Sequence, residues 1–94
     1  MIRESNDRLY VSGPITLENV MQIVDAGARY LDGVPRVFDF SEVSEIDSAS
    51  VSLMLEWSRR ARASGAPVRF ANLGESIRSL IELYGVGDLI QLDA

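Results

Sequence analysis

Residues 36–57 read "RVFDFSEVSEIDSASVSLMLEW", and this stretch decides how the whole chain is interpreted. Its first five residues, Arg36 to Phe40, form a nearly continuous apolar run. Such a run is typical of a strand that is covered on both faces, as in a parallel sheet with helices around it. Small polar residues follow, and from Ala49 to Ala63 the chain has the pattern of a helix, which stops at Gly65. The stretch therefore predicts a strand, a tight turn and a helix.

The N-terminal part predicts a hairpin and a first helix. "IRES" and "RLYVS" flank the turn-forming pair Asn6–Asp7, which indicates two antiparallel strands, the second ending at Gly13–Pro14. In residues 17–31 apolar side chains, beginning with Leu17, recur at helical spacing, and Thr16 is the expected N-cap. We therefore expect a hairpin and then a helix before the strand of the quoted stretch.

The C-terminal part continues the alternation of strands and helices. The run "VRFANL" (68–73) predicts another strand, and residues 75–84 predict a third helix that Gly85 and Gly87 close. No linker or internal repeat divides the chain. The sequence therefore predicts one α/β domain over residues 1–94 with a mixed sheet.

Composition narrows the possible functions. The chain has no cysteine and no histidine, which excludes disulfides, thiolate nucleophiles, histidine bases and the usual zinc sites. The formal net charge of −5 argues against nucleic acid and against an anionic membrane surface as partners. No segment approaches the ~20 apolar residues of a membrane span, and the N-terminus lacks the apolar core of a signal peptide. We expect a cytoplasmic protein without direct membrane insertion.

The turn "EIDSAS" (45–50) is the first candidate site. Asp47 and Ser48 stand where the loop becomes a helix, and both are favoured N-cap residues, so one interpretation is a capped helix and nothing more. A helix N-terminus also favours negative charge, and a serine in such a loop is exposed. Ser48 is therefore equally a candidate for a partner contact or for phosphorylation.

The helix after this turn provides a second candidate. At about 100° per residue, one face forms the expected core stripe: Val51, Met54, Leu55, Ser58 and Ala61. Leu53 and Trp57 fall to the side of that stripe, on the same flank as Ser50, so we expect an exposed apolar patch one turn beyond Ser48. Tryptophan is enriched at interface hot spots, which favours a partner-binding surface over a side chain covered by a loop.

A group of carboxylates raises the question of catalysis. Asp39, Glu42, Glu45 and Asp47 fall within nine residues, and paired carboxylates can act in acid–base chemistry. No glycine-rich phosphate loop or aromatic-lined segment accompanies them, and their spacing matches no familiar metal site. We expect solvated loop charges, and hence no catalytic residues, no metal and no cofactor.

Taken together, these segments resemble a STAS domain. The resemblance covers nearly the whole chain, through "VSGPIT" (11–16), "VFDFSEVSEIDSASVSLMLEW" (37–57) and "VRFANLGESIRSLIELYGV" (68–86). It is closest to the small MlaB-like branch, through "LMLEW" and "LYGV". The resemblance implies a STAS fold, with a mixed sheet of about four strands flanked by about three to four helices.

The same resemblance implies a function. An MlaB-like protein is a non-catalytic subunit that binds and supports the ABC ATPase of a phospholipid transporter, which maintains outer-membrane lipid asymmetry. It would lie in the cytoplasm, peripheral to the inner membrane, in a complex that also contains a membrane permease. By similarity, the hydroxyl of the family's motif falls on Ser48 after Asp47, and the partner surface would include Ser50, Leu53 and Trp57.

The alternative is the anti-sigma-factor antagonist branch of the same fold. There a partner kinase, the anti-sigma factor, phosphorylates the motif hydroxyl, here Ser48, and phosphorylation breaks the complex. One departure from the family pattern is Ser50, because many members carry glycine at that position. Serine restricts the backbone more than glycine does, so we expect the turn to be more helical here.

Overall fold

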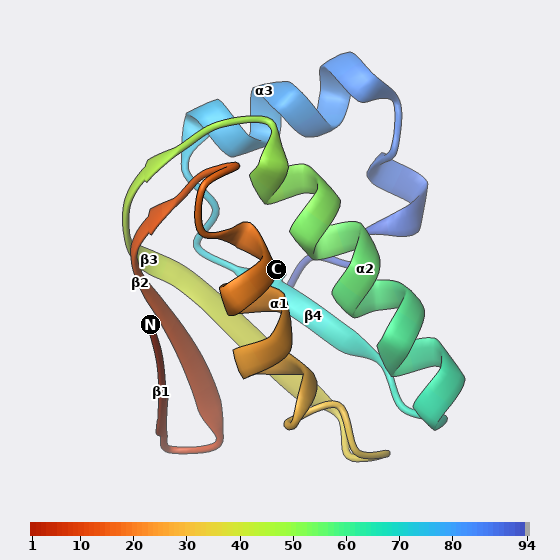
Figure 1. Cartoon of the computed structure of the whole chain (residues 1–94). Coiled ribbons are helices and arrows are strands. Elements are labelled where there is room, and N and C mark those ends of the chain that lie inside the picture. The colour runs from red at the N-terminus through yellow and green to blue at the C-terminus, as the bar shows by residue number, and fades with distance from the viewer. Residues whose placement is uncertain (94) are drawn as a thin grey trace.

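A four-stranded sheet forms the centre of the computed structural model, which describes residues 1–93 (Figure 1). The strands are β1 (Ile2–Ser5), β2 (Arg8–Ile15), β3 (Arg36–Ile46) and β4 (Val68–Ala71), and they lie side by side in that order. β1 runs antiparallel to β2, whereas β3 runs parallel to both β2 and β4. The predicted mixed sheet is confirmed.

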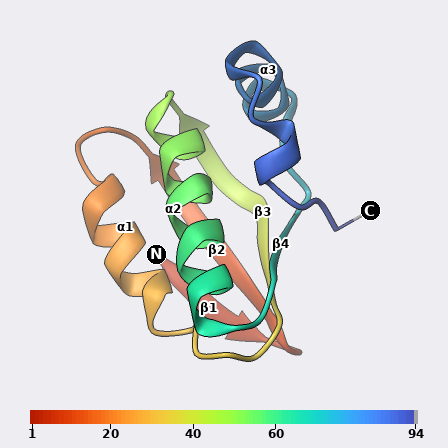
Figure 2. The ribbon, with the colours of Figure 1, turned by 90° about the vertical axis from the view of Figure 1, so that its right-hand side faces the viewer.

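Three α-helices and a short 3₁₀ helix accompany the sheet: α1 (Val20–Ala28), α2 (Ala49–Ser64), α3 (Glu75–Tyr84) and η1 (Gly87–Leu89). Figure 1 shows α1 and α2 next to each other in front of the strands, and the turned view in Figure 2 places both on the same side of the sheet. α3 lies at the end of the molecule where α2 begins (Figures 1 and 2). The turn before α2 therefore lies close to α3.

The N-terminal hairpin is confirmed, but its second strand is longer than predicted. Asn6 and Asp7 both have positive φ values, 53° and 65°, as the tight turn of such a hairpin requires. β2 then continues through Gly13–Pro14 to Ile15. The strand accommodates them through a shift of its register with β3 between Gly13 and Ile15, where Gly13 has a φ of +84°. Proline is tolerated at such an irregularity because its missing N–H is not needed there.

The first helix is shorter than predicted, and Thr16 is not its N-cap. α1 begins only at Val20, after Asn19. Thr16 instead starts a preceding turn, in which its carbonyl accepts the Val20 N–H and its own N–H donates to Asn19 Oδ1. Leu17 consequently lies ahead of the regular helix and is 78% exposed, although its spacing matched the core stripe.

β3 is also longer than the apolar run that predicted it, because residues 41–46 continue to pair with β2. Within the run, Phe38 and Phe40 belong to the buried apolar core. Asp39 lies on the opposite face of the strand and is also buried. The side chains of Arg8 and Asn72 contact it there, in the place where we expected a helix. The prediction that helices cover both faces of this strand was therefore wrong on the Asp39 side.

Trp57 lies at the centre of the core. Its indole ring stacks on Phe38 with a centroid distance of 4.0 Å and an interplanar angle of 15°, and its Nε1 donates to the Val24 carbonyl oxygen of α1 at 3.2 Å. Both Trp57 and Leu53 are 0% exposed. The predicted exposed patch is therefore wrong, because α1 covers the flank of α2 that we expected to face solvent.

Candidate functional site

Asp47 organises the turn between β3 and α2. Its Oδ1 accepts the Ala49 N–H at 2.8 Å, in the first turn of α2. Its Oδ2 accepts the Leu17 N–H at 2.9 Å, from the segment that precedes α1. One carboxylate thus satisfies an unpaired N–H at the start of α2 and connects that turn to the beginning of the first helix.

Ser48 occupies the N-cap position but does not cap. Its backbone is already helical, with φ −62° and ψ −19°, and its side chain makes no capping hydrogen bond. The side chain is exposed. The interpretation of Ser48 as a capping residue is therefore wrong, because Asp47 takes that role and leaves the Ser48 hydroxyl on the surface.

Ser50 lies inside the first turn of α2 and is fully buried. Its Oγ donates to the Asp47 carbonyl oxygen at 2.8 Å, and its N–H donates to the same oxygen at 3.1 Å. The turn is helical from Ser48 onward, and whether glycine at position 50 would make it less so stays a prediction. Of the expected site residues, only Asp47 and Ser48 reach the surface, while Ser50, Leu53 and Trp57 are buried.

Exposed or half-buried apolar side chains lie on two segments next to the Asp47–Ser48 turn, the one that leads into α1 and α3. Leu17, whose N–H bonds Asp47, is 78% exposed, and Met21 in the first turn of α1 is 67% exposed. On the α3 side, Leu80 lines a shallow groove together with Ser48, and Leu83, one turn further along, is 75% exposed. We call Leu17, Met21, Ser48, Leu80 and Leu83 the turn surface.

Sequence analysis missed the apolar members of the turn surface. Leu17 matched the core spacing of the first helix, and only the late start of α1 places it outside that helix. Leu80 and Leu83 required knowledge of where α3 packs. Acidic residues surround these apolar side chains, since Glu18 follows Leu17 and Glu75 lines the same groove as Ser48.

Three of the four clustered carboxylates, those of Asp39, Glu42 and Asp47, make separate structural contacts, and the expectation of a solvated charge was wrong for Asp39, which is buried. Asp39 Oδ2 accepts from Arg8 Nη1 at 2.9 Å and from Asn72 Nδ2 at 2.8 Å, and its Oδ1 accepts the Ser41 N–H at 2.8 Å. Burial by itself would raise the pKa of Asp39, but the hydrogen bonds from Ser41, Arg8 and Asn72 outweigh it and hold the pKa below its ordinary value. Glu42 on β3 pairs with Arg3 on the edge strand β1, across the intervening strand β2.

Two kinds of feature are absent from the described residues, 1–93. These residues contain no group of three or more histidine, cysteine, aspartate or glutamate side chains placed to hold a metal ion. Their helices include none that is both long enough and apolar enough to span a membrane.

The fold and the Asp-Ser turn at the start of α2 define a STAS domain. The chain matches the protein family described as "Mlab, STAS domain" over residues 2–91. It therefore belongs to this MlaB-like STAS family, and the resemblance seen in the sequence is confirmed. STAS domains in general mediate protein–protein contacts and are non-catalytic. No curated protein matches the chain in sequence.

Several solved structures share the fold. The anti-sigma factor antagonist SpoIIAA in its unphosphorylated form gives a TM-score of 0.73 at 17% identity, covering 100% of this chain and 87% of that one. Phosphorylated SpoIIAA from Bacillus gives 0.66 at 17% identity, covering 100% and 90%. A Thermotoga maritima protein proposed to be an anti-sigma factor antagonist gives 0.77 at 14% identity, covering 100% and 86%. These similarities confirm the expected STAS fold.

Proposed function

We propose that this chain is a non-catalytic binding subunit that docks on the ABC ATPase of a phospholipid transport system. Membership of the MlaB-like family supports the transporter. The observation that carries the docking site is the exposed Ser48 hydroxyl, between exposed Leu17 on one side and the groove lined by Leu80 on the other, while the Asp47 carboxylate caps α2. In such a complex the chain lies on the cytosolic side of the inner membrane, held there by the ATPase and its permease.

The turn surface replaces the patch that we expected around Leu53 and Trp57. Large apolar side chains that are exposed close together mark interaction sites more often than scattered ones do. Burying a leucine or methionine side chain on docking contributes about 1.5–3 kcal/mol before the costs of association. Leu17, Met21 and Leu83 are each at least two-thirds exposed, so each has most of that area to bury.

The acids around the turn surface indicate the chemistry of its partner. Glu18, Glu75 and Asp47 bring negative charge to the rim, and the whole chain has a net charge of −5. Complementary charge steers association and fixes the orientation of a complex. The partner surface is therefore expected to be apolar at its centre and basic at its edge.

The alternative function is that of an anti-sigma factor antagonist controlled by phosphorylation of Ser48. The structural similarity to SpoIIAA, solved both with and without phosphate, favours this second candidate. Ser48 suits a kinase because its hydroxyl is exposed and is not needed to cap the helix. A phosphate there would add about −1.5 to −2 charges beside Asp47 and Glu75, and would oppose any partner selected for basic residues.

Affinity purification of the tagged chain from its native host, with mass spectrometry of the bound proteins, separates the two candidates. Recovery of an ABC ATPase with a permease supports the transporter subunit. Recovery of an anti-sigma factor kinase, together with Ser48 carrying phosphate in the intact-mass spectrum, would replace it by the antagonist. A Met21→Glu variant serves as the site control, because loss of the same partner from this variant assigns the contact to the turn surface.

A further inference from the structure

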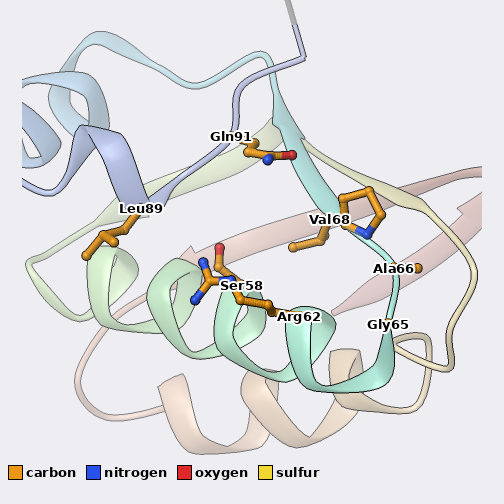
Figure 3. Close-up of a pocket in the computed structure, with 8 residues that line it drawn as sticks. Ser58, Arg62, Gly65, Ala66, Val68, Leu89 and Gln91 are labelled. Atoms are coloured by element: carbon orange, nitrogen blue, oxygen red, sulfur yellow. The ribbon is translucent and has the colours of Figure 1, made fainter.

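A second surface site lies at the opposite end of α2 from the turn surface. It is a cavity of about 260 Å³ between the C-terminal half of α2, the loop into β4, and the segment that follows α3 (Figure 3). Arg62 in this cavity is fourteen residues beyond Ser48, which along a helix is about 21 Å. The cavity is therefore separate from the proposed docking site, and a ligand could bind it whether or not that site holds its partner.

The floor of the cavity is apolar. Ala66 and Val68 are 8% and 4% exposed, and Leu89 of η1 also lines the cavity. Figure 3 shows the Val68 side chain beneath the opening and Leu89 on the side of η1. A floor of this kind accommodates the apolar part of a ligand, and the volume limits that part to less than a drug-sized molecule.

The wall of the cavity is cationic. Arg62 extends along α2 toward Ser58 and Leu89 (Figure 3), and it takes part in no ion pair within residues 1–93. Its helix neighbours Arg59 and Arg60 differ, because both pair with Glu56. None of the described lining residues is acidic. Arg62 is thus an available guanidinium above an apolar floor, and its planar donors match a carboxylate in bidentate geometry.

The main chain of β4 adds a further donor at this edge. Phe70 donates its N–H to the Gln91 carbonyl oxygen at 3.0 Å, so its main-chain groups face the C-terminal segment rather than β3. The Arg36 N–H on β3 donates to the Pro67 carbonyl oxygen at 3.2 Å. The main-chain N–H and C=O groups of the odd-numbered residues at β4 therefore point toward β3. By this alternation the Val68 N–H points to the free edge, where the cavity lies.

Two polar groups near the cavity, the Ser58 hydroxyl and the Ala61 carbonyl oxygen, already have hydrogen-bond partners within the chain. The Ser58 hydroxyl hydrogen is used within α2, in a 2.8 Å bond to the Met54 carbonyl oxygen. The Ala61 carbonyl oxygen at the end of α2 is already occupied by the N–H groups of Gly65 and Ala66. The contacts to a ligand anion therefore fall to Arg62, the Val68 N–H and the Gln91 side-chain amide.

We infer that this cavity binds a small organic carboxylate, with its apolar body on Ala66 and Val68 and its carboxylate on Arg62. The test is a titration of the full chain with 4-fluorobenzoate, followed by ligand ¹⁹F NMR and by protein ¹H–¹⁵N spectra. We expect saturable shifts confined to Ala66, Val68 and Leu89, with millimolar or tighter affinity. Arg62→Gln should weaken binding at least about fivefold, because the charge-assisted contact is lost.

Matched controls make the result decisive. Arg59→Gln lies on the same helix but outside the cavity lining and should bind 4-fluorobenzoate as the wild type does. The neutral probe 4-fluorobenzamide should bind more weakly than the carboxylate, and Leu89→Ala should weaken both probes by removing the apolar wall. The inference is overturned if no saturable shift occurs, if the shifts spread over other surfaces, or if Arg62→Gln and Arg59→Gln behave alike.

Discussion

The indole ring of Trp57 lies so close to Gly27 that a Cβ atom on residue 27 would overlap it. This contact joins α1 to α2, together with the hydrogen bond from Trp57 Nε1 to the Val24 carbonyl oxygen. The tryptophan that resembled an interface hot spot in the sequence is therefore the side chain around which the two helices pack. We propose that partner binding falls instead to the turn surface.

Gly27→Ala should destabilise the fold. Alanine favours a helix over glycine by up to about 1 kcal/mol, but the added methyl group would displace the Trp57 ring, and overpacking of a core costs about 1–3 kcal/mol. We expect net destabilisation in urea unfolding, with Gly74→Ala, where the added Cβ meets open space, as the control. An increase in stability for Gly27→Ala would contradict the packing described for Trp57.

Asp47 and Ser48 should differ sharply when each is replaced by alanine. Asp47→Ala removes the acceptor for the Ala49 and Leu17 N–H groups and should cost about 0.5–2 kcal/mol, the range for loss of an N-cap. Ser48→Ala removes an exposed hydroxyl that caps nothing, and should change the free energy of unfolding by no more than about 0.5 kcal/mol. Chemical denaturation of both variants measures the difference, and equal losses would show that Ser48 shares the capping role.

Asp39 should make the stability of the fold depend on acidity. Its pKa is lower in the folded chain than the ordinary value of 3.8, so the folded state favours the ionised carboxylate. The stabilisation is fully present above pH 3.8 and is lost as pH falls through the folded pKa. Asp39→Asn cannot ionise, so this variant should be less stable at neutral pH and should lose less stability on acidification than the wild type does. Unfolding curves at neutral and acid pH test this, and parallel losses in both proteins would argue against it.

Glu56 provides a contrasting case on the surface. Hydrogen bonds from Arg59 and Arg60 lower the pKa of Glu56 from 4.5 to about 2. Because these pairs face solvent, salt should screen them, whereas the buried contacts of Asp39 should be screened much less. We expect high salt to reduce the stability difference between wild type and Glu56→Gln and to leave that of Asp39→Asn nearly unchanged. Equal salt sensitivity would contradict the burial of Asp39.

Sequence reasoning predicted the fold well wherever local signals decide it. The Asn6–Asp7 turn, the apolar run at β3 and the glycine stop of α2 at Gly65 depend on short-range chemistry, and the structure bears them out. The bounds of α3, Glu75–Tyr84, also agree with the prediction. The course of β2 past Gly13–Pro14 depends on its pairing with β3, and such long-range pairing leaves no local signal.

Only part of the candidate site could be predicted, because the rest depends on long-range packing that leaves no local signal in the sequence. Asp47 and Ser48 were found because cap chemistry is local to the turn. The burial of Leu53 and Trp57 depends on α1 packing against α2, which a helical wheel of α2 alone does not contain. The spacing of Leu17 predicted a helical residue, but α1 begins only at Val20, which leaves Leu17 outside the helix and exposed.

The most direct test of the central claim is the affinity of the purified chain for the ABC ATPase recovered from its host, compared between Met21→Glu and Val34→Glu. Both residues are large, apolar and exposed, by 67% and 51%, but only Met21 belongs to the turn surface. We expect Met21→Glu to weaken binding at least about tenfold, because an apolar contact is lost and a charge is buried in its place, and Val34→Glu to bind like the wild type. Unchanged affinity for Met21→Glu would contradict docking through the turn surface.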